Sequence, residues 1–283
     1  MKEEFELDET TLVAYYGTDQ DIVIPEGVTK IDCHVFNKGE RSYLPRVKSV
    51  VFPESLQVIG YCTFFDCELE SLRLPGQLQE IDHMAFNSNP FREVEIPASV
   101  KRVGGASFCG CKKLTRVSLP EGLEKLERSA FAACTALEEI SIPGSVSELE
   151  CTFYDCTQLK RVELHEGLKT LTDQVFGGCT SLQELRIPET VTKIDDRVFG
   201  ESKPIRVTVL AVRDSYAYRW AKEHGFPVRE VAPERPAPSQ TEAVGGQDLK
   251  LAIENVKGLK ELVDLGILTS AEFEKKKKEL LGL

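Results

Sequence analysis

The sequence lacks a long hydrophobic run, and it is short of positive charge. No segment of the 283 residues approaches the roughly 18 apolar residues of a membrane-spanning helix, so we expect no membrane insertion. The formal net charge of −11 disfavours a nucleic-acid partner, because such proteins concentrate positive charge. The first ten residues, MKEEFELDET, are acidic and lack the basic end and apolar stretch of a signal peptide. We therefore expect a cytoplasmic protein.

Reactive groups are also scarce. The chain has only four histidines and contains no H-E-x-x-H, G-x-S-x-G or phosphate-binding loop. Its nine cysteines are an odd number, and without a secretion signal they indicate free thiols in a reducing compartment. The sequence therefore predicts no enzyme, no catalytic residue, no metal site and no cofactor.

What the chain has in abundance is repetition. A phenylalanine recurs at steps of 22 or 23 residues, with one longer step of 28. A proline that follows a short apolar alternation recurs in the same register, with His165 in one vacant position. The phenylalanines are Phe36, Phe64, Phe86, Phe108, Phe131, Phe153, Phe176 and Phe199, and the prolines are Pro25, Pro53, Pro75, Pro97, Pro120, Pro143 and Pro188. Two markers in a common register predict a solenoid.

Each repeat has the pattern of one coil of such a solenoid. In Val117-Ser118-Leu119 the apolar and polar residues alternate, as in a strand with one buried face. The proline then ends the strand, because it has no amide hydrogen to donate. One coil cannot bury its apolar residues alone, whereas stacked coils form a continuous core. The predicted fold is mainly β: a solenoid with short parallel strands in each 22–23-residue coil, capped at both ends.

A cysteine follows most of these phenylalanines by three residues. Cys67, Cys111, Cys134, Cys156 and Cys179 hold this position, and Asn89 replaces the cysteine after Phe86. Gly39 and Ser202 hold the position in the outer coils. A position shared by cysteine, asparagine, serine and glycine suits a small group turned inward at a bend. A straight column of thiols is a poor match to a tetrahedral metal site. We therefore expect a structural role.

The repeat pattern resembles the BspA-like subclass of leucine-rich repeats. Segments such as IPGSV, LPEGL and IPEGV, each followed by apolar pairs and a phenylalanine, carry the resemblance over about residues 20–205. The flanking segments Phe5 to Val28 and Leu210 to Val231 resemble the hairpin that opens such arrays and the strand, helix and strand that close them. This resemblance implies a solenoid over residues 1–231, with an N-terminal cap of about 1–20 and a C-terminal cap of about 207–231. It also implies recognition of a partner, in relatives that are often exported surface proteins.

A different composition begins after Val231. Residues 232–247 are rich in proline, glycine and small polar residues, which predicts a flexible linker. Residues 248–283 have apolar residues at helical spacing and resemble the SHOCT family of short C-terminal modules. That resemblance implies a two-helix module for oligomerisation or docking. Its exposed apolar residues are Leu259, Leu262, Phe273 and Leu280.

Two surfaces are candidates for binding a partner. Before each apolar trio the charge alternates in sign along Glu93, Arg116, Glu139, Arg161, Glu184 and Arg206, and the middle of the trio adds Arg73, Glu95, Glu163 and Arg186. Opposite charges on adjacent strands stabilise a sheet, so this face either neutralises itself or docks a protein. The second candidate is the insertion in the long coil, with Arg41, Tyr43 and Arg46. Insertions in repeat arrays often carry contacts.

The function predicted from these features is a non-enzymatic protein-interaction scaffold. The solenoid recognises a protein partner of unknown identity, and the C-terminal module mediates homo-oligomerisation or docking. The alternatives are a cell-surface adhesin and, less favoured, a glycan-binding protein or an enzyme.

Overall fold

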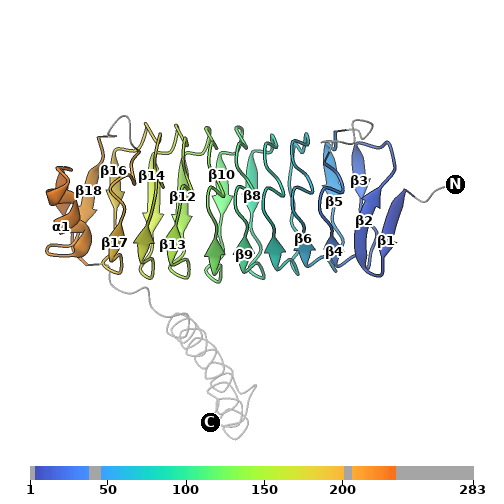
Figure 1. Ribbon diagram of the computed structural model, residues 1–283, viewed down its shortest axis with the longest axis horizontal. Coiled ribbons are helices and arrows are strands. Elements are labelled where there is room, and N and C mark those ends of the chain that lie inside the picture. The colour runs from blue at the N-terminus through green and yellow to red at the C-terminus, as the bar shows by residue number, and fades with distance from the viewer. Residues whose placement is uncertain (1–3, 38–45, 201–205, 234–283) are drawn as a thin grey trace, which may run out of the picture. The chain divides into compact units, whose positions relative to one another are not determined.

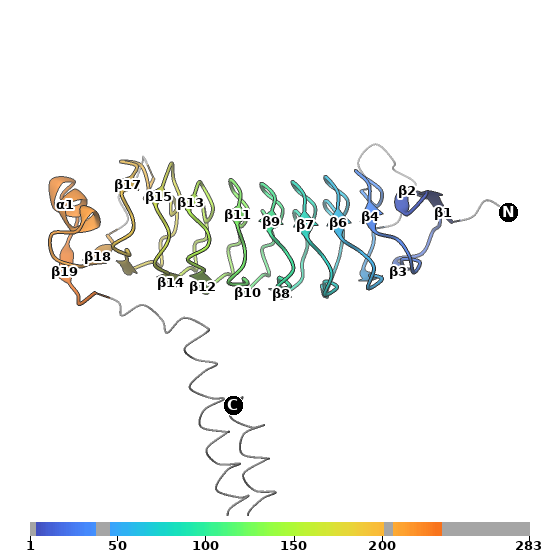
Figure 2. The same cartoon turned by 90° about the horizontal axis from the view of Figure 1, so that it is seen from below.

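The computed structural model describes residues 4–37, 46–200 and 206–233, which belong to one compact unit, Met1–Pro233. Within it the chain winds through successive coils, whose strands form two opposite faces (Figures 1 and 2). The solenoid and its short parallel strands are as the repeats predict. The two-helix module predicted for residues 248–283 lies outside the described residues, together with Leu259, Leu262, Phe273 and Leu280.

We call the face that carries the strands preceding the coil prolines the front face, and it lies along the lower edge of the solenoid in Figure 2. Its strands are β3 (Asp21–Val23), β5 (Ser49–Val51), β8 (Glu93–Glu95), β10 (Arg116–Ser118), β12 (Glu139–Ile142), β14 (Arg161–Leu164), β16 (Glu184–Arg186), β18 (Thr208–Ala211) and β19 (Val228–Glu230). Alternate residues of these strands point into the core, so that Val117 is buried between the exposed Arg116 and Ser118. This alternation fixes which side chains a partner can reach.

The back face carries shorter strands that follow the prolines. These are β4 (Lys30–Ile31), β6 (Val58–Ile59), β7 (Glu80–Ile81), β9 (Arg102–Val103), β11 (Lys125–Leu126), β13 (Glu148–Leu149), β15 (Thr170–Leu171) and β17 (Lys193–Ile194). At one end of the array, β1 (Phe5–Asp8) and β2 (Thr11–Tyr15) form an antiparallel hairpin whose second strand pairs with β4. At the other end, β18, α1 (Tyr216–Glu223) and β19 cover the last coil. Ser215 caps α1 by accepting a hydrogen bond from the amide of Tyr218.

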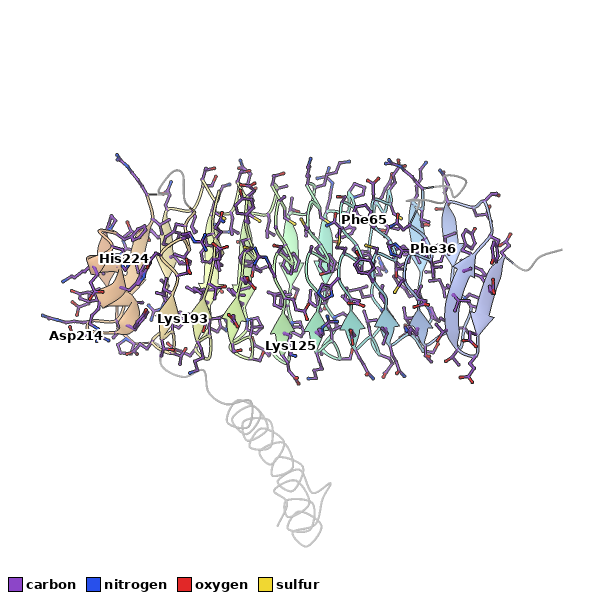
Figure 3. The ribbon with its side chains drawn as sticks, viewed as in Figure 1. Phe36, Phe65, Lys125, Lys193, Asp214 and His224 are labelled. Atoms are coloured by element: carbon purple, nitrogen blue, oxygen red, sulfur yellow. The ribbon has the colours of Figure 1, made fainter. Side chains whose placement is uncertain are left out.

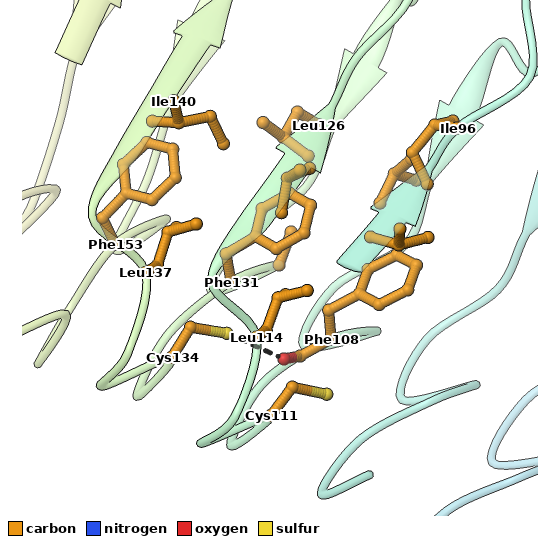
Figure 4. Packing of buried hydrophobic residues seen from close by; sticks show 14 of the residues in the cluster. Ile96, Phe108, Cys111, Leu114, Leu126, Phe131, Cys134, Leu137, Ile140 and Phe153 are labelled. Carbon is orange, nitrogen blue, oxygen red and sulfur yellow. Dashed lines mark hydrogen bonds between the residues drawn. The ribbon is translucent and has the colours of Figure 1, made fainter. Parts of the chain in front are cut away.

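The eight repeat phenylalanines form one buried column through the core. Their neighbouring rings are stacked at centroid distances from 5.0 to 6.3 Å, and Figure 4 shows Phe108, Phe131 and Phe153 in this arrangement. Leucine, isoleucine and valine side chains from both faces surround the column. The core is therefore continuous along the array, as stacking of incomplete coils requires.

The backbone around each phenylalanine forms a third set of hydrogen bonds between coils. The amides of Met84, Phe86 and Ser88 donate to carbonyls of the next coil, each at 2.9 Å. Met84 and Ser88 lie in the left-handed region, with φ of 55° and 61°, which costs about 1–2 kcal/mol for a residue with a side chain. Because Met84 and Ser88 on both sides of Phe86 are left-handed, the amides of all three residues point toward the next coil. This phenylalanine ladder continues from coil to coil and holds the array together.

The ladders of the two faces are less regular. On the front face, residues 71–74 belong to no strand, and the described residues show no pairing of β10 with β12 or of β14 with β16. On the back face, β2 to β11 form one sheet and β13 to β17 another. Both faces are therefore interrupted between the coil of Phe131 and the coil of Phe153, where only the phenylalanine ladder carries backbone hydrogen bonds in the described part of the chain.

Candidate partner-binding surface

A hollow with a volume of about 760 Å³ lies on the front face, and we call it the front hollow. It lies where the front ladder is interrupted, between residues 71–74 and β8, and extends to β10. Its lining residues are Leu72, Arg73, Leu74, Gly76, Glu93, Val94, Glu95, Pro97, Arg116 and Ser118. Among its apolar lining residues Leu72 and Val94 are buried and Leu74 is half-buried, whereas the charged lining residues are exposed.

The charges at the front hollow are not neutralised within the solenoid. Arg116 lies in register with Glu93 on the adjacent strand. Nevertheless, no ion pair joins Arg73, Glu95 or Arg116 to any residue of the part that the structure describes. All three side chains are exposed. They are therefore available to a partner of complementary charge.

The charges of the front face beyond β10 are paired instead. Arg161 forms an ion pair with Glu139, and Arg229 from β19 forms one with Glu184 at 2.6 Å. Hydrogen bonding to Glu139 and its negative charge raise the pKa of Arg161 above its ordinary value. Arg186 donates to the carbonyl oxygen of Ala232 at 2.8 Å. Ion pairs within the solenoid thus compensate the charges of Arg161, Glu139 and Glu184 on this part of the face.

The predicted alternation of charge is wrong at its last position. Glu184 lies in register with Thr208 and not with Arg206. The closing strand β19 pairs with β18 and brings Arg229 beside Glu184. The error came from extending the repeat register across the transition from the last coil to the cap.

A smaller hollow of about 310 Å³ lies beside the front hollow. It spans the interruption between β10 and β12 and includes Arg116, Glu139, Arg161 and Glu163. Here Ser141 Oγ lies 3.0 Å from Nε2 of His165. A serine beside a histidine resembles part of a catalytic triad, but no acid of the described chain contacts the other ring nitrogen of His165.

The front face also exposes two valines at its N-terminal end. Val23 and Val51 lie in register on β3 and β5, and these residues are 66% and 58% exposed. Sequence reasoning missed them because the trios in which they stand, all apolar from Ile22 to Ile24 and from Val50 to Phe52, do not show which residues face outward. The register of the coils settles this.

The insertion of the long coil is only partly described. Arg46 contacts Asp66 and Glu68 at 3.4 Å each, so its charge is used within the solenoid. Arg41 and Tyr43 lie outside the described residues.

The cysteine column has a specific hydrogen-bonding role. The thiol of Cys134 donates to the carbonyl oxygen of Phe108 at 3.2 Å (Figure 4), and the other four cysteines of the column make the equivalent bond to the phenylalanine of the preceding coil at 3.1 to 3.6 Å. Asn89 does the same with its side-chain amide at 2.7 Å. In these six coils the position carries a small hydrogen-bond donor, a property that cysteine and asparagine share.

Burial also suppresses the reactivity of these thiols. It raises the pKa of Cys67, Cys111 and Cys156 to about 12, and it raises the pKa of Cys134 and Cys179 far above the ordinary value. Nucleophiles and metal ligands are thiolates, so neutral buried thiols fit neither role. The described residues contain no group of three or more histidine, cysteine or acidic side chains placed to hold a metal ion.

On the back face, an ion-pair network connects three coils. Nδ1 of His83 lies 2.9 Å from Asp82 and its Nε2 lies 3.0 Å from Glu127, and Arg102 contacts Glu127 at 2.7 Å and also pairs with Glu80. Partial burial opposes ionisation of Asp82, but hydrogen bonds from His83 and the charge of Arg102 lower its pKa. The contact of His83 with Glu127 could not be predicted from the sequence, because Glu127 lies two coils from His83.

Short parallel strands on two opposite faces and a buried column of phenylalanines between them are typical of a leucine-rich-repeat solenoid. The family model described as "BspA type Leucine rich repeat region" matches residues 13–90, 42–151 and 79–206 with six copies. The chain therefore belongs to the BspA-type leucine-rich-repeat family, whose members are generally non-enzymatic binding scaffolds.

One solved structure supports the same fold, and two further leucine-rich-repeat structures show lower similarity. A leucine-rich repeat protein from Bacteroides ovatus ATCC 8483 is 27% identical, with a TM-score of 0.61 over 74% of this chain and 50% of that chain. The present chain thus spans half of that relative's length. A leucine-rich repeat protein of T. pallidum is 24% identical, with a TM-score of 0.43 over 78% and 91% of the two chains. A leucine rich cell surface protein from Faecalibacterium prausnitzii A2-165 is 19% identical, with a TM-score of 0.35 over 82% and 93%. A comparison with curated proteins gives no match.

Helices capable of crossing a membrane are absent from the part of the chain that the structure describes.

Proposed function

We propose that this protein is a protein-interaction scaffold that recognises its partner through the front hollow. The observation that carries the proposal is the set of exposed, unpaired charges at Arg73, Glu95 and Arg116 beside the apolar lining residues of that hollow. Interfaces commonly combine an apolar centre with a polar rim that sets specificity. The membership of the chain in a family of binding scaffolds supports the same function.

The test is affinity purification from the native host with a matched pair of variants. Arg73→Glu/Arg116→Glu reverses two charges at the front hollow, and Lys125→Glu/Lys193→Glu reverses two on the back face, where Figure 3 labels both lysines. We expect the front variant to lose the proteins captured by the wild type and the back variant to keep them. Equal capture by both variants would refute the front hollow as the binding site.

The C-terminal module is proposed to mediate homo-oligomerisation or docking. Its support is the amphipathic sequence pattern of residues 248–283, because two short helices bury too little apolar surface alone. Light scattering should give a larger particle for the full chain than for residues 1–247, and Phe273→Asp should behave like the truncation. A monomeric full chain at high concentration would exclude self-association and leave docking to another protein.

For localisation we propose the cytoplasm, and the nine cysteines, all free in the structure, are compatible with a reducing compartment. The competing proposal is a cell-surface adhesin, since one similar structure is described as a leucine rich cell surface protein. Cell fractionation with an antibody against the solenoid distinguishes the two. Glycan-array binding or a turnover dependent on Ser141 and His165 would instead support the glycan-binding or enzymatic alternatives.

A further inference from the structure

One column of outward-facing side chains runs along the front face into the front hollow. Val23, Val51, Arg73 and Glu95 each stand two residues before the proline of their coil, and the backbone register places Val23 beside Val51. All four side chains are exposed. Along the array the column therefore reads apolar, apolar, basic, acidic, one residue per coil.

The buried rings of the coils that carry this column are spaced at about the pitch of an α-helix, and we take their spacing as the advance from coil to coil. The stacked rings of the same four coils are separated by 5.0, 5.5 and 5.6 Å, and an α-helix advances about 5.4 Å per turn. In an extended strand, side chains on one face recur at about 6.7 Å. Over three coil steps an extended peptide would lose register by roughly 4 Å, whereas a helix parallel to the solenoid axis stays in register within about 1 Å.

We infer that the front face binds an α-helix of a partner protein lying along the solenoid axis. This inference rests on the proposed function of the front hollow and specifies its partner. The helix presents two apolar residues to Val23 and Val51, then an acid to Arg73 and a base to Glu95, at successive turns. An acid and a base one turn apart also stabilise a helix by themselves, so such a partner is preorganised for binding.

Charge and apolar exposure support this occupant together. The two valines are among the most exposed large hydrophobic residues of the described chain, and a helix with two apolar turns would cover them. Arg73 and Glu95 have no ion-pair partner among the described residues, so a complementary helix need not break an existing contact. The pairs between Arg161 and Glu139 and between Arg229 and Glu184 make the rest of the face less favourable for the same helix.

The experiment selects binders from a displayed library of helical peptides of about four turns. Four positions at one-turn spacing are randomised, and a second library presents the same residues in an extended, proline-containing frame. We expect the wild-type solenoid to enrich the order apolar, apolar, acidic, basic in the helical library only. Enrichment of extended peptides, or no common order, would overturn the inference.

A charge-exchanged protein provides the matched control. Arg73→Glu/Glu95→Arg should select the order apolar, apolar, basic, acidic and should weaken the best wild-type peptide by about tenfold, as expected for two reversed exposed pairs. Val51→Asp should weaken both classes of peptide. Circular dichroism and thermal melts confirm that each variant is folded. Selection of the same order by the wild type and the exchanged protein would contradict the inference.

The helix inference and the proposed function fail differently. If the native partner is lost with Arg73→Glu/Arg116→Glu but no helical order is enriched, the scaffold proposal stands and the helix is wrong. If native capture is unaffected by the front variant, the front hollow itself is wrong as the recognition site.

Discussion

The front face and the phenylalanine side of the same coils satisfy their backbones in different ways. On the phenylalanine side, alternate amides donate from coil to coil, and this ladder continues even between the coils of Phe131 and Phe153. On the front face, residues 71–74 belong to no strand, and β10 does not pair with β12. Charges also differ between the front and back faces, since the front hollow leaves Arg116 without an ion pair whereas the back face holds Arg102 in a network.

This difference shows where stability and recognition reside in the solenoid. On the phenylalanine side, the hydrogen bonds between coils and the stacked rings hold the array together. The array therefore remains intact where the strands of the front face do not pair. The front face is therefore free to vary in backbone pairing and in charge, which is what a recognition surface requires. Substitutions should consequently destabilise the protein most at the phenylalanine column and least at the front charges.

The largest effect is expected for Phe131→Ala. Phe131 is fully buried in the ring column, and its removal leaves a cavity that costs about 3–5 kcal/mol of unfolding free energy. The control is Val51→Ala on the front face, where the side chain is exposed and the cost should stay below about 0.5 kcal/mol. Urea melts measure both variants. A comparable loss in the two would contradict the division of the solenoid.

A smaller effect is expected for Arg102→Ala, with Arg116→Ala as its control. Loss of Arg102 leaves Glu80, Asp82 and Glu127 close together without their shared cation. Because the site is only partly buried, we expect a cost of about 1–2 kcal/mol. Arg116→Ala breaks no ion pair and should change stability by less than about 0.5 kcal/mol.

The Arg102 effect should also depend on pH. The pKa of Asp82 is lowered in the folded protein, so its contribution to stability is present at neutral pH and disappears as the pH falls through the folded value. The difference between the wild type and Arg102→Ala should therefore narrow below about pH 4. A difference that stays constant into acid would show that Arg102 acts by packing alone.

The next effect concerns the cysteine column. Cys134→Ala removes the thiol that donates to the carbonyl of Phe108 and should cost about 1 kcal/mol. Cys134→Ser keeps a donor at the same position and should cost less. Denaturant melts of the two variants test the role of the bond, and a serine variant weaker than the alanine variant would refute it.

Much of the fold could be predicted because each coil repeats the same physical problem. Phenylalanine marks the buried column in all eight coils, and proline marks the end of the front segment in seven of them, in the same register. The buried position of Cys134 follows from the same register. These features depend on local pattern, which the sequence displays directly.

The details of the surface depend on the register between coils and could not be predicted. From Leu149 to Phe153 the chain is one residue shorter than in the other coils, and it is here that β11 and β13 fail to pair. The contact of His83 with Glu127 likewise requires knowing which coils the side chains span. The candidate residues Arg73, Glu95 and Arg116 at the front hollow are exposed, but which charges are paired depends on side-chain geometry.

The smallest effect is expected for Arg161→Glu. The substitution breaks the ion pair with Glu139 and places an acid between Glu139 and Glu184 in neighbouring coils. The side chains of Arg161 and Glu139 are 70% and 54% accessible, so water and salt screen both the lost attraction and the new repulsion. We expect a loss of stability that is measurable at low salt and disappears in high salt, with little effect on partner capture. Strong loss of the captured partner at unchanged stability would instead extend the recognition surface beyond the front hollow, because Arg161 would then contact the partner directly.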